Sequence, residues 1–291
     1  MKLINYRKGM NERLGIWVDH DIFPMEALNH HYKLDFPVTL QLLIEMERMK
    51  DLHKWFKEKS LKELKNHVPE AINESEVTFA PLYRQPPKIW GIGLNYVDHA
   101  ADLHETAPNT EPASFMKPAT TVIGMGDEIQ IPPQSERTTG EAELGIVIGK
   151  RCKDVSEADA LSVVAGFTTV IDMTAEDILE KNPRYLTRSK SFDTFFSFGP
   201  ALLTPDEAGP IDDLEVSTLI NGKLHRKNIV ANMTFKPEML ISFHSQVMTL
   251  EPGDIISTGT PGAVHLKDGD TVRCEISGFP ALENPVKDLK N

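Results

Sequence analysis

Two glutamates, Glu141 and Glu143, stand at the start of an apolar run that is bounded by glycines. The run, residues 144–148, contains β-branched side chains and predicts a buried strand. Side chains alternate between the two faces of a strand, so both glutamates point to one face. Adjacent carboxylates repel each other, and burying them costs free energy unless a cation or a shared proton lies between them. The pair therefore indicates either a metal site or a solvated acidic face of an antiparallel sheet.

A third acid stands at a comparable position further along the chain. The strand-like run of residues 167–171 ends at Asp172, and residues 174–177 carry a helix-start signal. If this strand neighbours the one that carries Glu141 and Glu143, Asp172 completes a site of three carboxylates. Such an all-oxygen site suits a hard cation such as Mg²⁺, Mn²⁺ or Ca²⁺.

The composition excludes several classes of function. The chain of 291 residues has 43 acidic and 31 basic side chains, a formal net charge of -12, and no basic cluster, so nucleic acid is not an expected partner. No run approaches the roughly 20 apolar residues of a membrane helix, and we expect no membrane association. The first residues lack the apolar stretch of a signal peptide, which predicts a cytoplasmic protein.

The first part of the chain mixes strand and helix signals. Residues 2–6 and 14–18 are strand-like and flank a glycine, which predicts a hairpin. Apolar residues then recur at helical spacing over residues 38–57, which predicts one amphipathic helix. Together these signals predict a small α/β domain.

A domain boundary and a second, mostly β domain follow. Prolines cannot continue a helix or a central strand, and three of them predict a boundary between residues 1–80 and 81–291: Pro81, Pro86 and Pro87. Short strands dominate from residue 88 onward. Asn221 and Gly222 predict the tight turn of a hairpin, and Pro237 is suited to the first position of a helix that runs to about residue 249. The fold class is therefore α+β and mostly β.

The second part resembles the fumarylacetoacetate hydrolase family. Six segments occur in the order and spacing of that family, over about residues 88 to 285: residues 91–96 with Asp98 and His99, 115–118, 141–144, 171–175, 190–193 and 258–262. The resemblance implies a mixed β-roll or sandwich catalytic domain, a homodimer, and a Mg²⁺ or Mn²⁺ site. Its implied ligands are Glu141, Glu143 and Asp172.

The resemblance also implies a reaction and residues that perform it. Members act on 2-oxo acids with a second carbonyl at position 4, and they cleave the bond between carbons 3 and 4 or decarboxylate a related dicarboxylate. By this resemblance His99 is the base that activates water, and Asp102, three residues later, holds its tautomer. Lys190 is the positive charge beside the enolate oxygen. Thr260 and Lys117 are the expected substrate-binding residues.

Each of these residues also has a structural interpretation. His99 could be a solvated loop residue, Lys190 a surface lysine, Lys117 a structural lysine, and Thr260 part of a tight turn. The sequence departs from the family pattern at three positions: Asp102 replaces a glutamate, and Glu176 and Leu179 replace an arginine and a glutamine. His104 or Glu105 could substitute for Asp102. The changes at Glu176 and Leu179 indicate a different substrate or a more hydrophobic end of the pocket.

Three functional hypotheses follow. The first is a metal-dependent hydrolase of acylpyruvate-type 2,4-dioxo acids, similar to bacterial acylpyruvases. The alternative is an oxaloacetate decarboxylase or a 2-hydroxy-dienoate isomerase, similar to 2-hydroxyhepta-2,4-diene-1,7-dioate isomerase, which uses the same metal and Lys190 without attacking water. The third is a protein that binds Ca²⁺ or Mg²⁺ structurally, without turnover.

Overall fold

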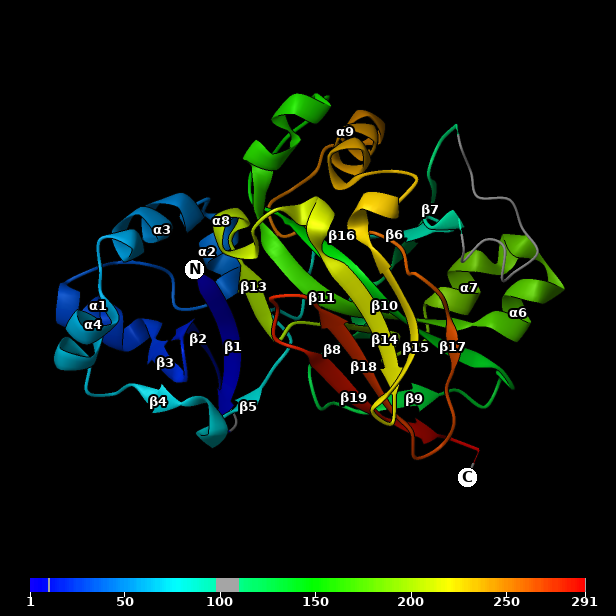
Figure 1. Ribbon diagram of the computed structural model, residues 1–291, viewed down its shortest axis with the longest axis horizontal. Helices are drawn as coiled ribbons and strands as arrows, with labels where there is room; N and C mark the ends of the chain where they lie inside the picture. The colour runs from blue at the N-terminus through cyan, green and yellow to red at the C-terminus, as the bar shows by residue number, and fades with distance from the viewer. Residues whose placement is uncertain (10, 98–109, 291) are drawn as a thin grey trace.

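Two long neighbouring strands, β10 (Thr138–Ile148) and β11 (Val164–Ala175), form the centre of the fold (Figure 1). The computed structural model describes residues 1–9, 11–97 and 110–290. Every residue of both strands is buried, as the apolar runs predict. They pair antiparallel with Glu141 directly opposite Asp172. The strands of the predicted acidic residues are therefore neighbours.

The described strands form two sheets. A 14-stranded sheet has the order β4-β3-β2-β1-β13-β11-β10-β16-β6-β7 with four strands off this path, and a five-stranded sheet has the order β15-β14-β18-β19-β9. β10 and β11 lie against β14 and β18 of the smaller sheet, which crosses in front of them in Figure 1. The main hydrophobic core combines buried residues of both sheets.

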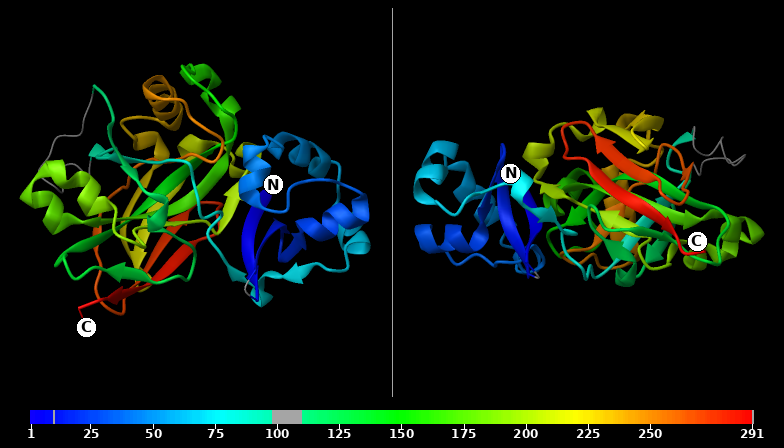
Figure 2. Two further views of the ribbon diagram at one scale, coloured as in Figure 1. Left: turned by 180° about the vertical axis from the view of Figure 1, so that it is seen from behind. Right: turned by 90° about the horizontal axis from the view of Figure 1, so that it is seen from below.

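Residues 1–80 form one end of the molecule, with helices outside the strands (Figures 1 and 2). The predicted hairpin is confirmed, since β1 and β2 pair from Lys2↔Trp17 to Lys8↔Asn11. This part contains β1 (Lys2–Lys8), β2 (Asn11–Val18), β3 (Asp21–Pro24), α1 (Met25–Tyr32), α2 (Leu40–Glu45), α3 (Met49–Lys57), α4 (Leu61–His67), β4 (Ile72–Asn73) and β5 (Thr78–Phe79).

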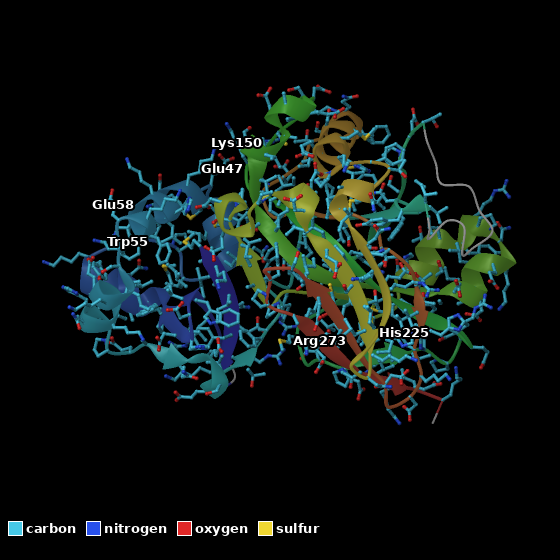
Figure 3. The ribbon with its side chains drawn as sticks, in the orientation of Figure 1. Glu47, Trp55, Glu58, Lys150, His225 and Arg273 are labelled. Atoms are coloured by element: carbon cyan, nitrogen blue, oxygen red, sulfur yellow. The ribbon has the colours of Figure 1, made fainter. Side chains whose placement is uncertain are left out.

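The prediction of a single helix over residues 38–57 is wrong, because α2 ends at Glu45 and α3 begins at Met49. Glu47 has a left-handed φ of 54°, and its N–H bonds to the Ile44 carbonyl, which closes α2. The Glu47 carboxylate accepts a hydrogen bond of 3.2 Å from the N–H of Arg151. Figure 3 labels Glu47 and Lys150, the residue before Arg151. A contact with the other part of the chain therefore accompanies this break.

The first part joins the larger sheet through β1. Lys2, Leu3 and Ile4 pair antiparallel with residues 201–203 of β13 (Ala201–Leu203). A second hydrophobic cluster combines Leu3 and Phe36 with buried residues of β10 and β11. The division into domains 1–80 and 81–291 stays a prediction.

Residues 81–290 supply the rest of the larger sheet and all of the smaller one, and the expected mostly β character of the fold is confirmed. Asn221 and Gly222 have φ of 51° and 74°, as the hairpin signal predicts. The elements are β6 (Ile89–Gly93), β7 (Ala113–Lys117), β8 (Val122–Ile123), β9 (Ile129–Ile131), α6 (Glu176–Lys181), α7 (Leu186–Lys190), β12 (Phe196–Phe198), α8 (Pro205–Ala208), β14 (Glu215–Ile220), β15 (Lys223–Ile229), α9 (Pro237–Val247), β16 (Ile255–Ser257), β17 (Val264–His265), β18 (Thr271–Ile276) and β19 (Leu282–Asp288).

Candidate metal centre

Three carboxylates converge on one face of β10 and β11. Cross-strand pairing places Glu141 opposite Asp172, and Glu143 follows on the same face of β10. One oxygen from each carboxylate lies within 4.8 Å of the others. Glu141 is 7% exposed, and Glu143 and Asp172 are each 1% exposed. The alternative of a solvated acidic face does not fit this burial.

Two buried lysines face the carboxylates. The Nζ of Lys190, at the end of α7, lies 3.0 Å from Glu141 Oε2 and 2.5 Å from Asp172 Oδ2. It also lies 4.6 Å from the centroid of the Phe115 ring, within the range of a cation–π interaction. The Nζ of Lys117, at the end of β7, pairs with Asp172 Oδ1 and donates to the Met173 carbonyl at 3.0 Å. Lys190 is therefore not a surface lysine. The ion pair of buried Lys117 with Asp172 fits its structural interpretation, and its contact with substrate stays a prediction.

Neighbouring hydroxyl groups hold Glu141 in place. Its Oε1 accepts hydrogen bonds from Thr139 Oγ1 at 3.1 Å and from Thr174 Oγ1 at 2.8 Å. Both threonines stand two positions from an acid on the same strand face, one on each strand. The two-residue alternation that predicted the glutamate pair could have identified them.

Glu143 is held by the last residue of β16 and by the segment that follows it. Its Oε2 accepts hydrogen bonds from Ser257 Oγ and from the N–H of Gly259 at 3.0 Å. Gly259 has a φ of 94°, and a Cβ there would lie 2.8 Å from the Cβ of Asn95. Asn95 donates to the Thr258 carbonyl at 2.7 Å, which ties this segment to the end of β6. No local pattern predicted that Ser257, Gly259 and Asn95 support a carboxylate, although they lie in or beside the recognised motifs.

Burial and charge set the protonation of the centre. Burial and, to a smaller extent, the negative charge of Asp172 together raise the pKa of Glu143 to about 8. Burial also lowers the pKa of Lys117 to about 8, against the opposing effect of Asp172. Burial acts in the same direction on Lys190, but the charges of Asp172 and Glu141 outweigh it and raise the pKa of this lysine. Lys190 is therefore a permanent positive charge in the centre.

The donor set fits a hard divalent cation. Glu141, Glu143 and Asp172 offer only oxygen atoms, the ligands that Mg²⁺ and Mn²⁺ prefer. Three buried carboxylates also provide the negative charge that such an ion requires. The buried triad could therefore hold Mg²⁺ or Mn²⁺.

The remaining predicted residues are Thr260, which follows Gly259 in the chain, and four residues outside the described part of the chain. Thr260 is 3% exposed, and its hydroxyl exchanges hydrogen bonds of 3.2 Å with the backbone of Gly262. It therefore shapes the turn, and its contact with substrate stays a prediction. His99, Asp102, His104 and Glu105 lie outside the described residues.

The departure from the family pattern at Glu176 has a structural counterpart. Its carboxylate lies 2.9 Å from Arg137 Nε and 3.0 Å from His265 Nε2. The backbone N–H of Glu176 also bonds to the Arg137 carbonyl, which continues the β10–β11 pairing beyond Thr138. The cation of Arg137, the residue before β10, thus accompanies the anion at this position.

Comparisons with known proteins agree with this arrangement. Residues 88–287 match the family model described as fumarylacetoacetate (FAA) hydrolase C-terminal. The chain is 40% identical over 221 residues to the human mitochondrial oxaloacetate tautomerase FAHD2B, which covers 73% of this chain and 70% of the human protein.

Solved structures extend the likeness to nearly the whole chain. A maleylpyruvate hydrolase from Sphingobium sp. SYK-6, in complex with manganese(II) ion and pyruvate, has a TM-score of 0.78 and 26% identity, with 99% of each chain covered. A 2-hydroxyhepta-2,4-diene-1,7-dioate isomerase from Mycobacterium marinum has a TM-score of 0.77 and 25% identity, with all of both chains covered. Among the described residues, no helix is both long and apolar enough to cross a membrane.

Proposed function

The chain belongs to the fumarylacetoacetate hydrolase family, and we propose that it is a divalent-metal-dependent enzyme that acts on a small 2-oxo acid through its enol form. The observation that carries this proposal is the burial of Glu141, Glu143 and Asp172 beside Lys190. Three carboxylates, two lysines and a divalent cation together have one net positive charge. The centre is therefore suited to an anionic substrate such as a 2-oxo acid.

Each residue of the centre has a separate proposed role. Mg²⁺ or Mn²⁺ held by the three carboxylates would supply a Lewis acid that polarises the 2-oxo group. Lys190 keeps a positive charge beside the position where an enolate oxygen develops, in surroundings where burial strengthens electrostatic stabilisation. Lys117 fixes Asp172 through an ion pair and donates to the adjacent carbonyl of Met173. Thr260 stays the proposed contact for the substrate carboxylate.

Keto–enol interconversion of an oxaloacetate-like 2-oxo acid is the reaction we propose first. The human relative named oxaloacetate tautomerase is 40% identical, whereas the structural relatives named as a hydrolase and an isomerase are 26% and 25% identical. Tautomerisation moves one proton between carbon 3 and the 2-oxo oxygen and needs no attacking water. The charge of Lys190 would stabilise the enolate that forms in this reaction.

Hydrolysis of acylpyruvates is the second candidate. It is supported by the fold shared with maleylpyruvate hydrolase along 99% of this chain. This reaction needs a base that activates water, and we propose His99, oriented by Asp102, for that role. Both residues lie outside the described part of the chain, so this candidate rests on the comparison and on the shared enolate chemistry.

One assay separates these reactions. Purified protein is incubated with Mn²⁺ or Mg²⁺, and the enol absorbance of oxaloacetate is followed beside pyruvate release. We expect faster keto–enol exchange without pyruvate, and loss of this acceleration when a chelator is added. Pyruvate from oxaloacetate would identify a decarboxylase, and pyruvate from an acylpyruvate would identify a hydrolase. No metal-dependent turnover of either substrate would contradict the proposed function.

Matched variants connect the activity with the site. Glu143→Gln removes one proposed ligand, and we expect it to weaken Mn²⁺ binding and to abolish turnover at low Mn²⁺. Glu283→Gln removes a surface carboxylate that pairs with Arg273 at 3.6 Å, and should leave both properties unchanged. Equal behaviour of the two variants would contradict the assignment of Glu143.

A further inference from the structure

The edge of β10 that faces away from β11 pairs with different strands on either side of the acidic centre. This edge pairs with β17 at Thr139 and Gly140 and with β16 from Gly145 to Val147. Between them, at Ala142, no described strand pairs with this edge. The N–H of Ala142 donates instead to the side-chain oxygen Oγ1 of Thr218, at 3.2 Å. A hydroxyl group from the smaller sheet thus accepts the hydrogen bond that the backbone of a neighbouring strand would otherwise accept at Ala142.

Thr218 belongs to the five-stranded sheet, which contributes none of the three carboxylates. It lies in β14 directly opposite Cys274 of β18, and both side chains are 0% exposed. The Cys274 thiol donates to the Glu143 carbonyl at 3.9 Å, a weak contact. The cross-strand pair therefore contacts the backbone of two successive residues, Ala142 and Glu143.

The bond to Thr218 has a direct effect on the neighbouring carboxylates. A buried N–H that loses its acceptor is destabilised, so the peptide would shift toward another acceptor. Glu141 and Glu143 leave the backbone on either side of Ala142, and their oxygens must stay within 4.8 Å of each other and of Asp172. Any shift of this peptide changes the positions of two of the three carboxylates together.

We propose that Thr218 is a positioning residue that sets the affinity of the carboxylate triad for a divalent cation. Its hydroxyl fixes the peptide between the two glutamates and thereby the separation of their carboxylates. The inference rests on the metal site of the proposed function, but it is independent of which 2-oxo acid is the substrate.

The test measures Mn²⁺ binding to the full chain from the electron paramagnetic resonance signal of the free ion, without any substrate. Thr218→Val keeps the shape of the side chain and removes the acceptor, and we expect about a tenfold weaker affinity, as for other residues that support metal ligands. Thr218→Ser keeps the hydroxyl and should retain wild-type affinity. The matched control is Thr168→Val, because Thr168 is also 0% exposed and its hydroxyl donates to the Ala201 carbonyl in β13 instead of bonding to the backbone of the strand that carries the glutamates.

A second measurement separates positioning from general stability. A purely structural role of Thr218 lowers the melting temperature equally with and without Mn²⁺, whereas a positioning role reduces the rise that Mn²⁺ produces. If Thr218→Val does not fold, Thr218→Ala is measured with the same expectation.

Three results would overturn the inference. They are wild-type affinity in the variant that lacks the hydroxyl, an equal loss in Thr168→Val, and a loss in Thr218→Ser as large as in Thr218→Val. Failure of the wild-type chain to bind Mn²⁺ would remove the metal site itself, and that result is distinguishable from a difference among the variants.

Discussion

The burial of Glu143 predicts an unusual pH dependence of stability in protein freed of metal by a chelator. The folded state raises the pKa of this carboxyl from 4.5 to about 8, so it binds the proton more tightly than the unfolded state does. The resulting stabilisation is complete below pH 4.5 and is lost as the pH rises through 8. At 1.36 kcal/mol per pH unit, the full loss is at most about 5 kcal/mol.

The perturbation is Glu143→Gln, which places a neutral side chain of the same shape at this position. We measure the free energy of unfolding by urea denaturation between pH 5.5 and 8.5, with chelator present, for wild type, Glu143→Gln and the surface control Glu283→Gln. Wild type and Glu283→Gln should lose stability as the pH rises, and Glu143→Gln should lose much less. Lys117 acts in the opposite direction only above its folded pKa of about 8, outside most of this window.

Parallel curves for wild type and Glu143→Gln would refute the reasoning, because the loss would then come from other groups. A second result bears on the metal. Saturating Mn²⁺ should remove most of the pH dependence of wild type above pH 7, because a bound cation compensates the charge of the ionised carboxylate. Persistence of the wild-type slope with Mn²⁺ would contradict Glu143 as a ligand.

Three further predictions follow from the site. Lys190→Met should lower kcat by about 10² to 10³ with a smaller change in KM, because the charge of Lys190 stabilises the developing enolate. Steady-state kinetics measure this, with Lys227→Met as the control, because Lys227 is a surface lysine paired with Glu215. Equal kcat values of the two variants would contradict the role of Lys190. Gly259→Ala should destabilise the fold by more than Gly222→Ala in thermal denaturation, because both have positive φ but only Gly259 has a close contact, 2.8 Å to Asn95 Cβ; equal losses would contradict a specific contact. Ser257→Ala should weaken Mn²⁺ binding by about tenfold, because Ser257 Oγ bonds to Glu143, and unchanged affinity by calorimetry would remove Ser257 from the support of the site.

The sequence predicted the acidic centre better than its surroundings. Strand alternation places Glu141 and Glu143 on one face, and this local geometry does not depend on the rest of the fold. The pairing of Glu141 with Asp172 depends on the register of two strands that are separated by a long connection. The periodicity of the sequence therefore predicted the three-carboxylate site only on the condition that these strands are neighbours. The resemblance to a family supplied Lys190 and Lys117, which periodicity alone could not distinguish from surface lysines.

Other features depend on contacts that no local pattern encodes. Glu47 is a good helix former, yet it adopts a left-handed conformation that ends α2 and contacts Arg151. The sequence predicts only that Thr218 lies in a strand. Its proposed positioning role depends on the hydrogen bond from Ala142, which forms because the smaller sheet crosses β10 between β16 and β17. The homodimer and the cytoplasmic location stay predictions.

The pairing of β1 with β13 has a consequence for any shortened version of this protein. Removal of residues 1–80 would uncover the hydrogen-bonding edge of β13, together with the apolar cluster beneath Leu3 and Phe36. A bare strand edge is a template for pairing with another polypeptide, so such fragments should self-associate and precipitate instead of remaining dispersed. The first 80 residues would then protect the protein against aggregation, whatever else they do.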